Sequence, residues 1–369
     1  MNFRAKLLSC LIPVMLSGCV ADYGESGPET GDAGTGVSVP VWYATDRARI
    51  DGAGDGVPGY GDGRGETTHG VADIRLPPVH VAGRLEEPAL ASAGVVADPR
   101  WHVYVELARS LPREAFVGEL RAALDGSDSR GILLYIHGYN TGFGRSVRRA
   151  GQLAHDVDYD GVAMAFTWPS AGNVGGYLAD LNNADWAVSH LAETLLLLAR
   201  DAGAERIDLI AHSMGSRLLI QALDRLARGR AVTDPPLFGE VIFAAPDVDS
   251  DIFAAAVARL RPLVGRFTLY VSGGDVALAT SRRLAGDHPR AGESGRGMVV
   301  MADLDTVDAS AVGDDLFGHE YFGESAPVLN DIRLLLRDGA GAAERPRLER
   351  AFHLGRSYWR LLPPAAPGA

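Results

Sequence analysis

Residues 206–215 read Arg-Ile-Asp-Leu-Ile-Ala-His-Ser-Met-Gly. Residues 206–211 are a short, nearly continuous apolar run, which is typical of a strand buried on both faces of a sheet. A segment with the spacing of an amphipathic helix begins immediately afterwards, at residue 214. The stretch therefore predicts a strand, a sharp turn that carries Ser213, and a helix.

Similar patterns surround this stretch on both sides. Apolar runs occupy residues 131–136, 161–167, 240–245, 267–272 and 298–302. Amphipathic segments occupy residues 143–157, 182–201, 214–229, 249–262 and 324–337. Alternating strands and helices predict an α/β fold with a mostly parallel, doubly wound sheet and right-handed crossovers. Functional side chains are then expected at the carboxyl ends of the strands.

The composition fits a large globular domain. The chain has 369 residues, of which 47% are hydrophobic and 22% are charged, so the apolar material for a core is ample. The formal net charge of −12 argues against nucleic acid as an electrostatic partner. Both cysteines lie within the first twenty residues, so a disulfide framework is excluded.

The N-terminus has the features of a secretory leader. Arg4 and Lys6 precede an apolar run at residues 7–16, which is too short to span a bilayer. We expect a signal peptide at residues 1–18 and, because residues 19–37 are rich in Gly, Ser, Glu and Asp, a flexible tether there.

The end of this leader, Leu-Ser-Gly-Cys at residues 16–19, resembles the lipobox of bacterial lipoproteins. The resemblance implies that Cys19 is lipidated and holds the protein to a membrane of the cell envelope. Because Val20 follows the cysteine, it further implies the outer membrane. The alternative is an ordinary signal peptide with a chance cysteine.

The remaining chain divides into a main domain and a tail. We expect the main domain at residues 38–345, in which residues 38–111 form a strand-rich N-terminal extension that precedes the alternating pattern. Residues 346–369 are expected to form a C-terminal helix and tail. A G-x-G-x-x-G match within residues 52–65 lacks the strand and helix that a nucleotide site needs, so we interpret this segment as a surface loop.

The turn at Ser213 resembles the nucleophile elbow of the α/β-hydrolases, in which the usual pattern is G-x-S-x-G. In such a sharp turn the residues two before and two after the serine must be small. Here they are Ala211, in place of the usual glycine, and Gly215. The resemblance implies an α/β-hydrolase fold with Ser213 as its nucleophile.

An oxyanion loop is implied by the same resemblance. Residues 137–140 read His-Gly-Tyr-Asn after a predicted strand and are similar to the family's His-Gly loop. The oxyanion would then be bound by the backbone N–H groups of Tyr139 and Met214. We interpret His137 as a structural residue of this loop.

The order Ser, acid, His in this family limits the remaining members of a triad. His319 follows the last predicted strand, which is where the family places its base, and we prefer it over His288 and His353. Asp275, after the strand at 267–272, is the preferred acid. Asp247 and Asp249 follow the preceding strand and stay open as alternatives.

Several further segments, in order, resemble bacterial α/β-hydrolases classed as a domain of unknown function, many of them envelope proteins. The segments are residues 41–47, 137–140, 166–170, 211–215, 245–247, 275–278 and 318–319. The resemblance implies a serine hydrolase of carboxylic-ester type that works through an acyl-enzyme, with a small ester or acyl substrate and with no metal or cofactor. A catalytically inactive envelope lipoprotein, with the fold as a binding or scaffold module, is the alternative.

Overall fold

The computed structural model describes residues 36–50, 59–88, 97–228, 230, 234–312 and 321–364. The described residues all belong to one compact unit. The expected signal peptide, Cys19 and almost all of the expected tether lie outside the described residues. Within the described ranges, no helix combines the length and the hydrophobicity that crossing a bilayer requires.

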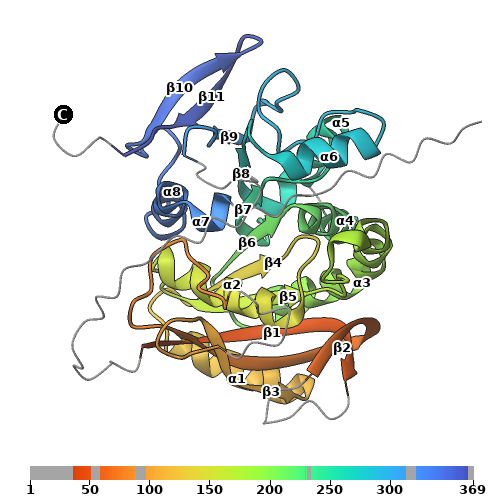
Figure 1. The fold of residues 1–369 in the computed structure, drawn as a ribbon, viewed down its shortest axis with the longest axis vertical. Coiled ribbons are helices and arrows are strands. Elements are labelled where there is room, and N and C mark those ends of the chain that lie inside the picture. Colours follow the sequence, from red (N-terminus) through yellow and green to blue (C-terminus); the bar gives the residue numbers. More distant parts are fainter. Residues whose placement is uncertain are drawn as a thin grey trace, which may run out of the picture. The chain divides into compact units, whose positions relative to one another are not determined.

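A single eleven-stranded sheet is the framework of this unit (Figure 1), and its order is β10-β11-β9-β8-β7-β6-β4-β5-β1-β2-β3. The strands are β1 (Val37–Ile50), β2 (Gly59–Leu76), β3 (Tyr104–Leu111), β4 (Gly131–Ile136), β5 (Val162–Thr167), β6 (Arg206–His212), β7 (Phe238–Ala244), β8 (Val264–Val271), β9 (Asp305–Asp308), β10 (Leu348–His353) and β11 (Arg356–Leu361).

Every pairing from β1 through β5, β4, β6, β7, β8 and β9 to β11 is parallel. Only the pairs β1–β2, β2–β3 and β10–β11 are antiparallel. All six residues of β4 and of β5 are buried, because helices cover both faces of the sheet. The predicted α/β fold with a mostly parallel, doubly wound sheet is therefore confirmed.

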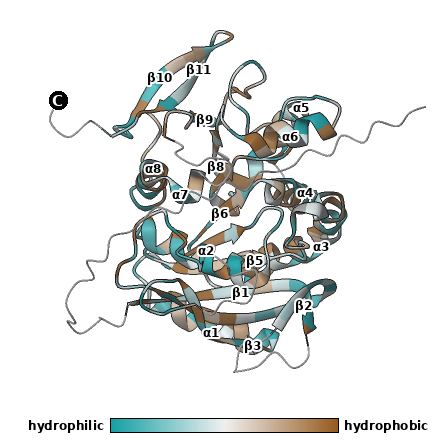
Figure 2. Ribbon diagram, viewed as in Figure 1, coloured by the Kyte–Doolittle hydropathy of each residue, from teal (hydrophilic) through white to brown (hydrophobic). Residues whose placement is uncertain are grey.

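Helices pack on the two faces of the sheet. They are α1 (Arg113–Asp125), α2 (Phe143–Asp156), α3 (Tyr177–Asp201), α4 (Met214–Ala227), α5 (Ser250–Leu260), α6 (Val276–Leu284), α7 (Tyr321–Glu324) and α8 (Ala326–Arg337). One core cluster contains apolar side chains of α1, α3, α4 and α5, and the other contains those of α2, α7 and α8. In Figure 2 these helices carry both hydrophobic and hydrophilic residues, as helices with one face on a sheet do.

The prediction of a C-terminal helix within residues 346–369 is wrong. Residues 348–361 form the hairpin β10–β11, and β11 pairs with β9 at the end of the sheet. The turn consists of Leu354 and Gly355, both with positive φ (48° and 80°). Two central residues with positive φ make a turn whose twist matches that of paired strands, so the chain forms a hairpin in place of a helix.

Two other expectations need correction. Residues 298–302 are not a strand: Met298 and Val299 are buried within a core cluster, and the strand that follows is β9. The apolar run thus reflects burial of a loop. Residues 59–65, expected in a surface loop, belong to β2, which pairs with β1. Helices α1 and α6 were not expected from the sequence.

Candidate active site

The order of the strands identifies one edge of the sheet as the place for a site. From β4 the chain passes to β5 on one side and then crosses to β6 on the other side. The loops that leave the carboxyl ends of β4 and β6 therefore run in opposite directions, and ligands of open α/β sheets bind at such a point. The loop after β4 carries Tyr139, and the turn after β6 carries Ser213.

Ser213 alone connects β6 to α4. Its backbone has φ 52° and ψ −122°, a conformation that is strained for a residue with a side chain. The side chain is almost fully buried, at 3% exposure. Ser213 lies at the N-terminus of α4, where the first backbone N–H groups, including that of Met214, have no partner within the helix. The predicted sharp turn is confirmed, and it places a hydroxyl at a helix N-terminus, where the first backbone N–H groups are not used within the helix.

Close packing requires small residues around this turn. A Cβ on Gly215 would lie 2.4 Å from the carbonyl oxygen of His137 and 2.7 Å from that of Ile136. A Cβ on Gly138 would lie 2.9 Å from the Cβ of Ser213. The loop after β4 therefore lies directly against the serine, and both glycines are needed for this approach.

His137 is a structural residue of that loop, as its contacts show. Its side chain is fully buried and stacks on Trp168 with a centroid distance of 4.9 Å. Nδ1 lies 2.7 Å from the carbonyl oxygen of Gly138, and the indole of Trp168 donates to the carbonyl oxygen of His137 at 2.8 Å. Burial lowers the pKa of His137 well below its usual value, so the ring is neutral and its Nδ1–H donates.

Two buried charged residues hold the loop in place, and sequence reasoning missed both. Asp180 of α3 accepts hydrogen bonds from the hydroxyl of Ser170 (2.5 Å) and from the backbone N–H groups of Asn140 (3.3 Å) and Ala171 (2.7 Å). The helix was expected to begin only at residue 182, so Asp180 had no predicted place. It joins the loops that follow β4 and β5.

The second of these residues is Arg47, which is 2% exposed. Its guanidinium donates to the carbonyl oxygens of Gly61 (2.9 Å), Thr141 (2.6 Å) and Ser170 (3.1 Å). One side chain of β1 thus holds the loops that follow β4 and β5 and ties them to β2. Its position in the segment 41–47, which supported the family resemblance, was the only signal in the sequence.

Next to Arg47, at an irregularity in the pairing of β1 with β2, lies Asp46. Asp46 is fully buried, and neither of its carboxylate oxygens has a hydrogen-bond partner from another described residue. Burial raises the pKa of Asp46 from 3.8 to about 7. The folded protein therefore holds a proton on this group at pH values where the unfolded chain has lost it.

We expect this proton to make stability depend on pH. Between pH 3.8 and about 7 the folded state binds one more proton than the unfolded chain, so the free energy of unfolding falls as the pH rises through this interval. The upper limit of the loss is about 4 kcal/mol. Asp46→Asn, which is always neutral, should be more stable than the wild type at pH 8 and should lose this dependence.

Urea denaturation of the wild type and of Asp46→Asn at pH 5 and pH 8 measures the effect. The control is Asp338→Asn, because Asp338 is exposed. An equal change in unfolding free energy between the two pH values in the wild type and in Asp46→Asn would contradict the expectation.

The three candidate acids have different surroundings. Asp275 follows β8, is 4% exposed, and accepts a hydrogen bond from the N–H of Leu278 at 2.8 Å as the N-cap of α6. Asp249 caps α5 in the same way, through the N–H groups of Asp251 and Ile252. Both lie after strands at the edge of the sheet that carries Ser213.

Asp247 is held by three side chains. Its carboxylate accepts from the hydroxyls of Tyr177 (2.8 Å) and Ser281 (2.5 Å) and lies 3.3 Å from Nε of Arg290. The backbone N–H of Asp247 donates to the carbonyl oxygen of Ser213 at 3.2 Å. Asp247 is thus next to the serine, while its carboxylate joins α3 to α6 and to the segment near residue 290.

The predicted base, His319, lies outside the described residues, as does Cys19. Tyr139 is partly buried in the loop after β4, and its ring contacts that of Tyr177 at 5.6 Å. A cavity of about 840 Å³ near residues 81–87 has no wall from Ser213, Asp247 or Asp275, so it is not part of the candidate active site. The described part of the chain contains one group of three potential metal ligands, His80, His155 and Asp156. None of the three is a predicted residue of the active site.

Similar solved structures include a dienelactone hydrolase from Anabaena variabilis (17% identity, TM-score 0.32, covering 56% of this chain and 84% of that chain). A cutinase from Trichoderma reesei in complex with a phosphonate inhibitor has 14% identity and a TM-score of 0.28, over 61% and 92% of the two chains. A siderophore hydrolase from Aspergillus fumigatus has 15% identity and a TM-score of 0.24, over 48% and 83%. No curated protein sequence matches the chain.

A family model also matches the sequence, over residues 113–337. This range runs from α1 to α8 and includes every strand from β4 to β9, the turn at Ser213 and the loop at Tyr139. It covers more than half of the chain. The protein therefore belongs to the family described as alpha/beta hydrolase of unknown function (DUF900).

Proposed function

We propose that this α/β-hydrolase is a serine hydrolase that cleaves carboxylic esters through an acyl-enzyme. The observation that carries the proposal is the conformation of Ser213, which is held in a strained turn at a helix N-terminus, against the loop that follows β4. Strain of this kind persists only where the surrounding packing imposes it, and it is concentrated at functional sites.

In the proposed reaction His319 takes the proton of the Ser213 hydroxyl while the oxygen attacks the ester carbonyl carbon. The backbone N–H groups of Tyr139 and Met214 stabilise the oxyanion. Asp275 orients the imidazole and stabilises its cationic form. His319 then gives the proton to the leaving alcohol, and an ester of Ser213 remains.

Water completes the cycle by the same steps. His319 removes a proton from a water molecule, the resulting hydroxide attacks the acyl carbon, and the proton returns to Ser213 as the acid leaves. Asp275 is preferred to Asp247 because the Asp247 carboxylate already accepts two hydroxyl hydrogen bonds and pairs with Arg290. Asp249 caps α5 as Asp275 caps α6, but Asp275 is the more deeply buried of the two, at 4% exposure, and it follows the strand where the family resemblance places the acid.

A fluorophosphonate probe tests the proposal, because it reacts covalently with an activated serine. The full chain should be labelled at a ratio of one probe per protein, and Ser213→Ala should not be labelled. If the folded wild type is not labelled, the fold serves as a binding or scaffold module, and the proposed activity is wrong.

We also propose that the chain is anchored in the outer membrane of the cell envelope by lipid on Cys19. Support comes from the sequence at residues 16–19, and two or three acyl chains are sufficient for stable anchoring. Cys19→Ala should move the protein from the membrane pellet to the soluble fraction, with Cys10→Ala as the matched control. Retention of Cys19→Ala in the pellet would contradict the anchor.

A further inference from the structure

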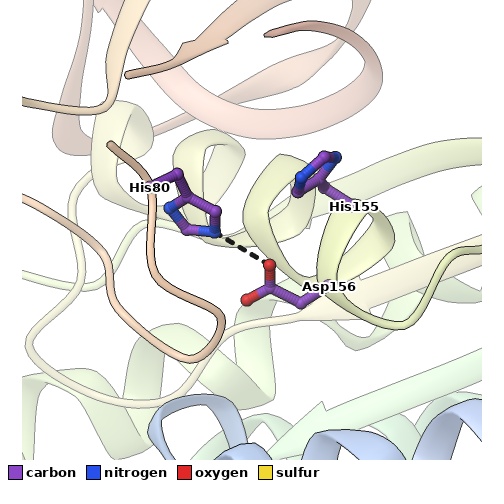
Figure 3. Close-up of side chains that lie close together, drawn as sticks. All are labelled: His80, His155 and Asp156. Carbon is purple, nitrogen blue, oxygen red and sulfur yellow. Dashed lines mark hydrogen bonds and ion pairs between the residues drawn. The ribbon is translucent and has the colours of Figure 1, made fainter. Parts of the chain in front are cut away.

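A cluster of two histidines and an aspartate lies where the segment after β2 packs on the end of α2. His80 comes from that segment, and His155 and Asp156 are the last two residues of α2 (Figure 3). Each offers one ligand atom, and the three atoms lie within 4.8 Å of one another. The cluster uses none of the residues assigned to the hydrolase site.

Hydrogen bonds fix the ring of His80 between two carboxylates. Its Nδ1 lies 2.9 Å from Oε2 of Glu86, and its Nε2 lies 2.8 Å from Oδ1 of Asp156. The side chain of His80 is 8% exposed and that of Asp156 is 1% exposed. A carboxylate on one ring nitrogen is the arrangement that orients a metal-binding histidine and leaves its other nitrogen for the metal.

The carboxylate of Asp156 is oriented in a similar way. Its Oδ2 accepts hydrogen bonds from the backbone N–H of Gly83 at 2.7 Å and from the side-chain amide of Gln152. These two donors hold Oδ2, so Oδ1 points to His80. Both buried ligand atoms are thus positioned by neighbours before any metal binds.

His155 differs from these two residues because it is exposed. Its ring lies 5.6 Å from that of His80, at an angle of 65°. Tetrahedral zinc with bonds of about 2.1 Å needs ligand atoms about 3.4 Å apart. The ligand atoms of His80 and Asp156 are 2.8 Å apart, so they must separate by about 0.6 Å, and the exposed side chain of His155 is able to rotate toward them.

We propose that His80, His155 and Asp156 bind one divalent transition-metal ion of the zinc class, with Glu86 orienting His80 and with solvent as the fourth ligand. Two imidazoles and one carboxylate suit such ions, whereas Mg²⁺ and Ca²⁺ prefer oxygen ligands throughout.

The hydrogen bond between Nε2 of His80 and Oδ1 of Asp156, at 2.8 Å, needs a proton between the two atoms. Metal binding therefore replaces this proton, which passes to solvent. The ion forms bonds to two ring nitrogens and one carboxylate oxygen, and no oxidation or reduction takes place.

The position of the cluster indicates a structural site. Helix α2 begins beside the loop that carries Tyr139 and ends at Asp156, so its length separates the two regions by about 20 Å. The metal would tie the segment at residues 77–88 to α2. The same segment is closely packed on the chain at α7, because a Cβ on Gly83 would lie 2.6 Å from the carbonyl oxygen of Glu324.

The experiment is calorimetric titration of the chelator-treated full chain with Zn²⁺, and with Mg²⁺ in parallel. Because thiolates also bind zinc, every protein in the set carries Cys10→Ser and Cys19→Ser. We expect one Zn²⁺ per chain, a higher melting temperature with Zn²⁺, and no saturable binding of Mg²⁺. His155→Ala should weaken Zn²⁺ binding at least about tenfold.

His155→Ala is the decisive variant because it removes one exposed ligand and leaves the hydrogen bonds of His80 intact. His288→Ala, at an exposed histidine outside the cluster, is the matched control and should bind Zn²⁺ like the parent. Absence of saturable Zn²⁺ binding, or equal affinity in His155→Ala and the parent, would show that the cluster is an ion-paired contact and would overturn the proposal.

Discussion

Ser213→Ala is expected to lower kcat/KM for a p-nitrophenyl ester by roughly 10⁵-fold, because the attacking oxygen is removed while the oxyanion donors stay. The structure favours a clean interpretation of this variant. Alanine retains the Cβ, so the backbone strain at φ 52° is the same in both proteins. The backbone N–H of Ser213 still donates to the carbonyl oxygen of Ala244 at 3.0 Å.

The melting temperature of Ser213→Ala should therefore be close to that of the wild type. Ser129→Ala is a matched control: Ser129 is exposed and precedes β4, at the opposite edge of the sheet from the turn. This control should keep the wild-type rate. Residual hydrolysis by Ser213→Ala that equals that of Ser129→Ala would mean that another group is the nucleophile.

The central part of the fold was predictable because burial on both faces leaves a signature in local sequence. Every residue of β4 and β5 is buried, and each strand is a continuous apolar run between turn residues. The single-residue connection at Ser213 was predictable for a related reason, since a strand pattern and a helix pattern meet there without a loop. These signals depend only on residues close together in the chain.

The hairpin β10–β11 shows where local patterns fail. Most residues of its strands are not buried, and β10 has a single buried position, Ala351. No regular alternation marks such a strand. Formation of the hairpin depends on the pairing of β11 with β9, about fifty residues earlier in the sequence, and on the positive φ of Leu354 in its turn.

The burial of charged residues was the other feature that could not be predicted from the sequence. Arg47 and Asp180 look in the sequence like ordinary surface residues, since arginine and aspartate are rarely fully buried. Their burial depends on carbonyl and N–H groups of loops that lie far away in sequence, such as Thr141 for Arg47. The candidate serine could therefore be identified from the sequence, but the framework that holds its loops could not.

The acid of the site is expected to be distinguished by a pair of isosteric variants. Asp275→Asn should lower kcat by about 10³- to 10⁴-fold, because an amide neither holds the imidazole in the required tautomer nor stabilises its cation. The fold should tolerate this change, since asparagine is also a good N-cap and can accept the hydrogen bond from Leu278 N–H.

Asp247→Asn should have the opposite balance of effects. It leaves Arg290 without its carboxylate partner and weakens the hydrogen bonds from Tyr177 and Ser281, so thermal stability should fall while kcat falls by no more than about tenfold. The pH dependence of kcat/KM separates catalysis from stability. Loss of the catalytic carboxylate lowers the pKa of the base and moves the acidic limb of the profile to lower pH. We expect this shift in Asp275→Asn and not in Asp247→Asn. The reverse pattern would assign the acid to Asp247, whose backbone N–H donates a hydrogen bond to the carbonyl oxygen of Ser213.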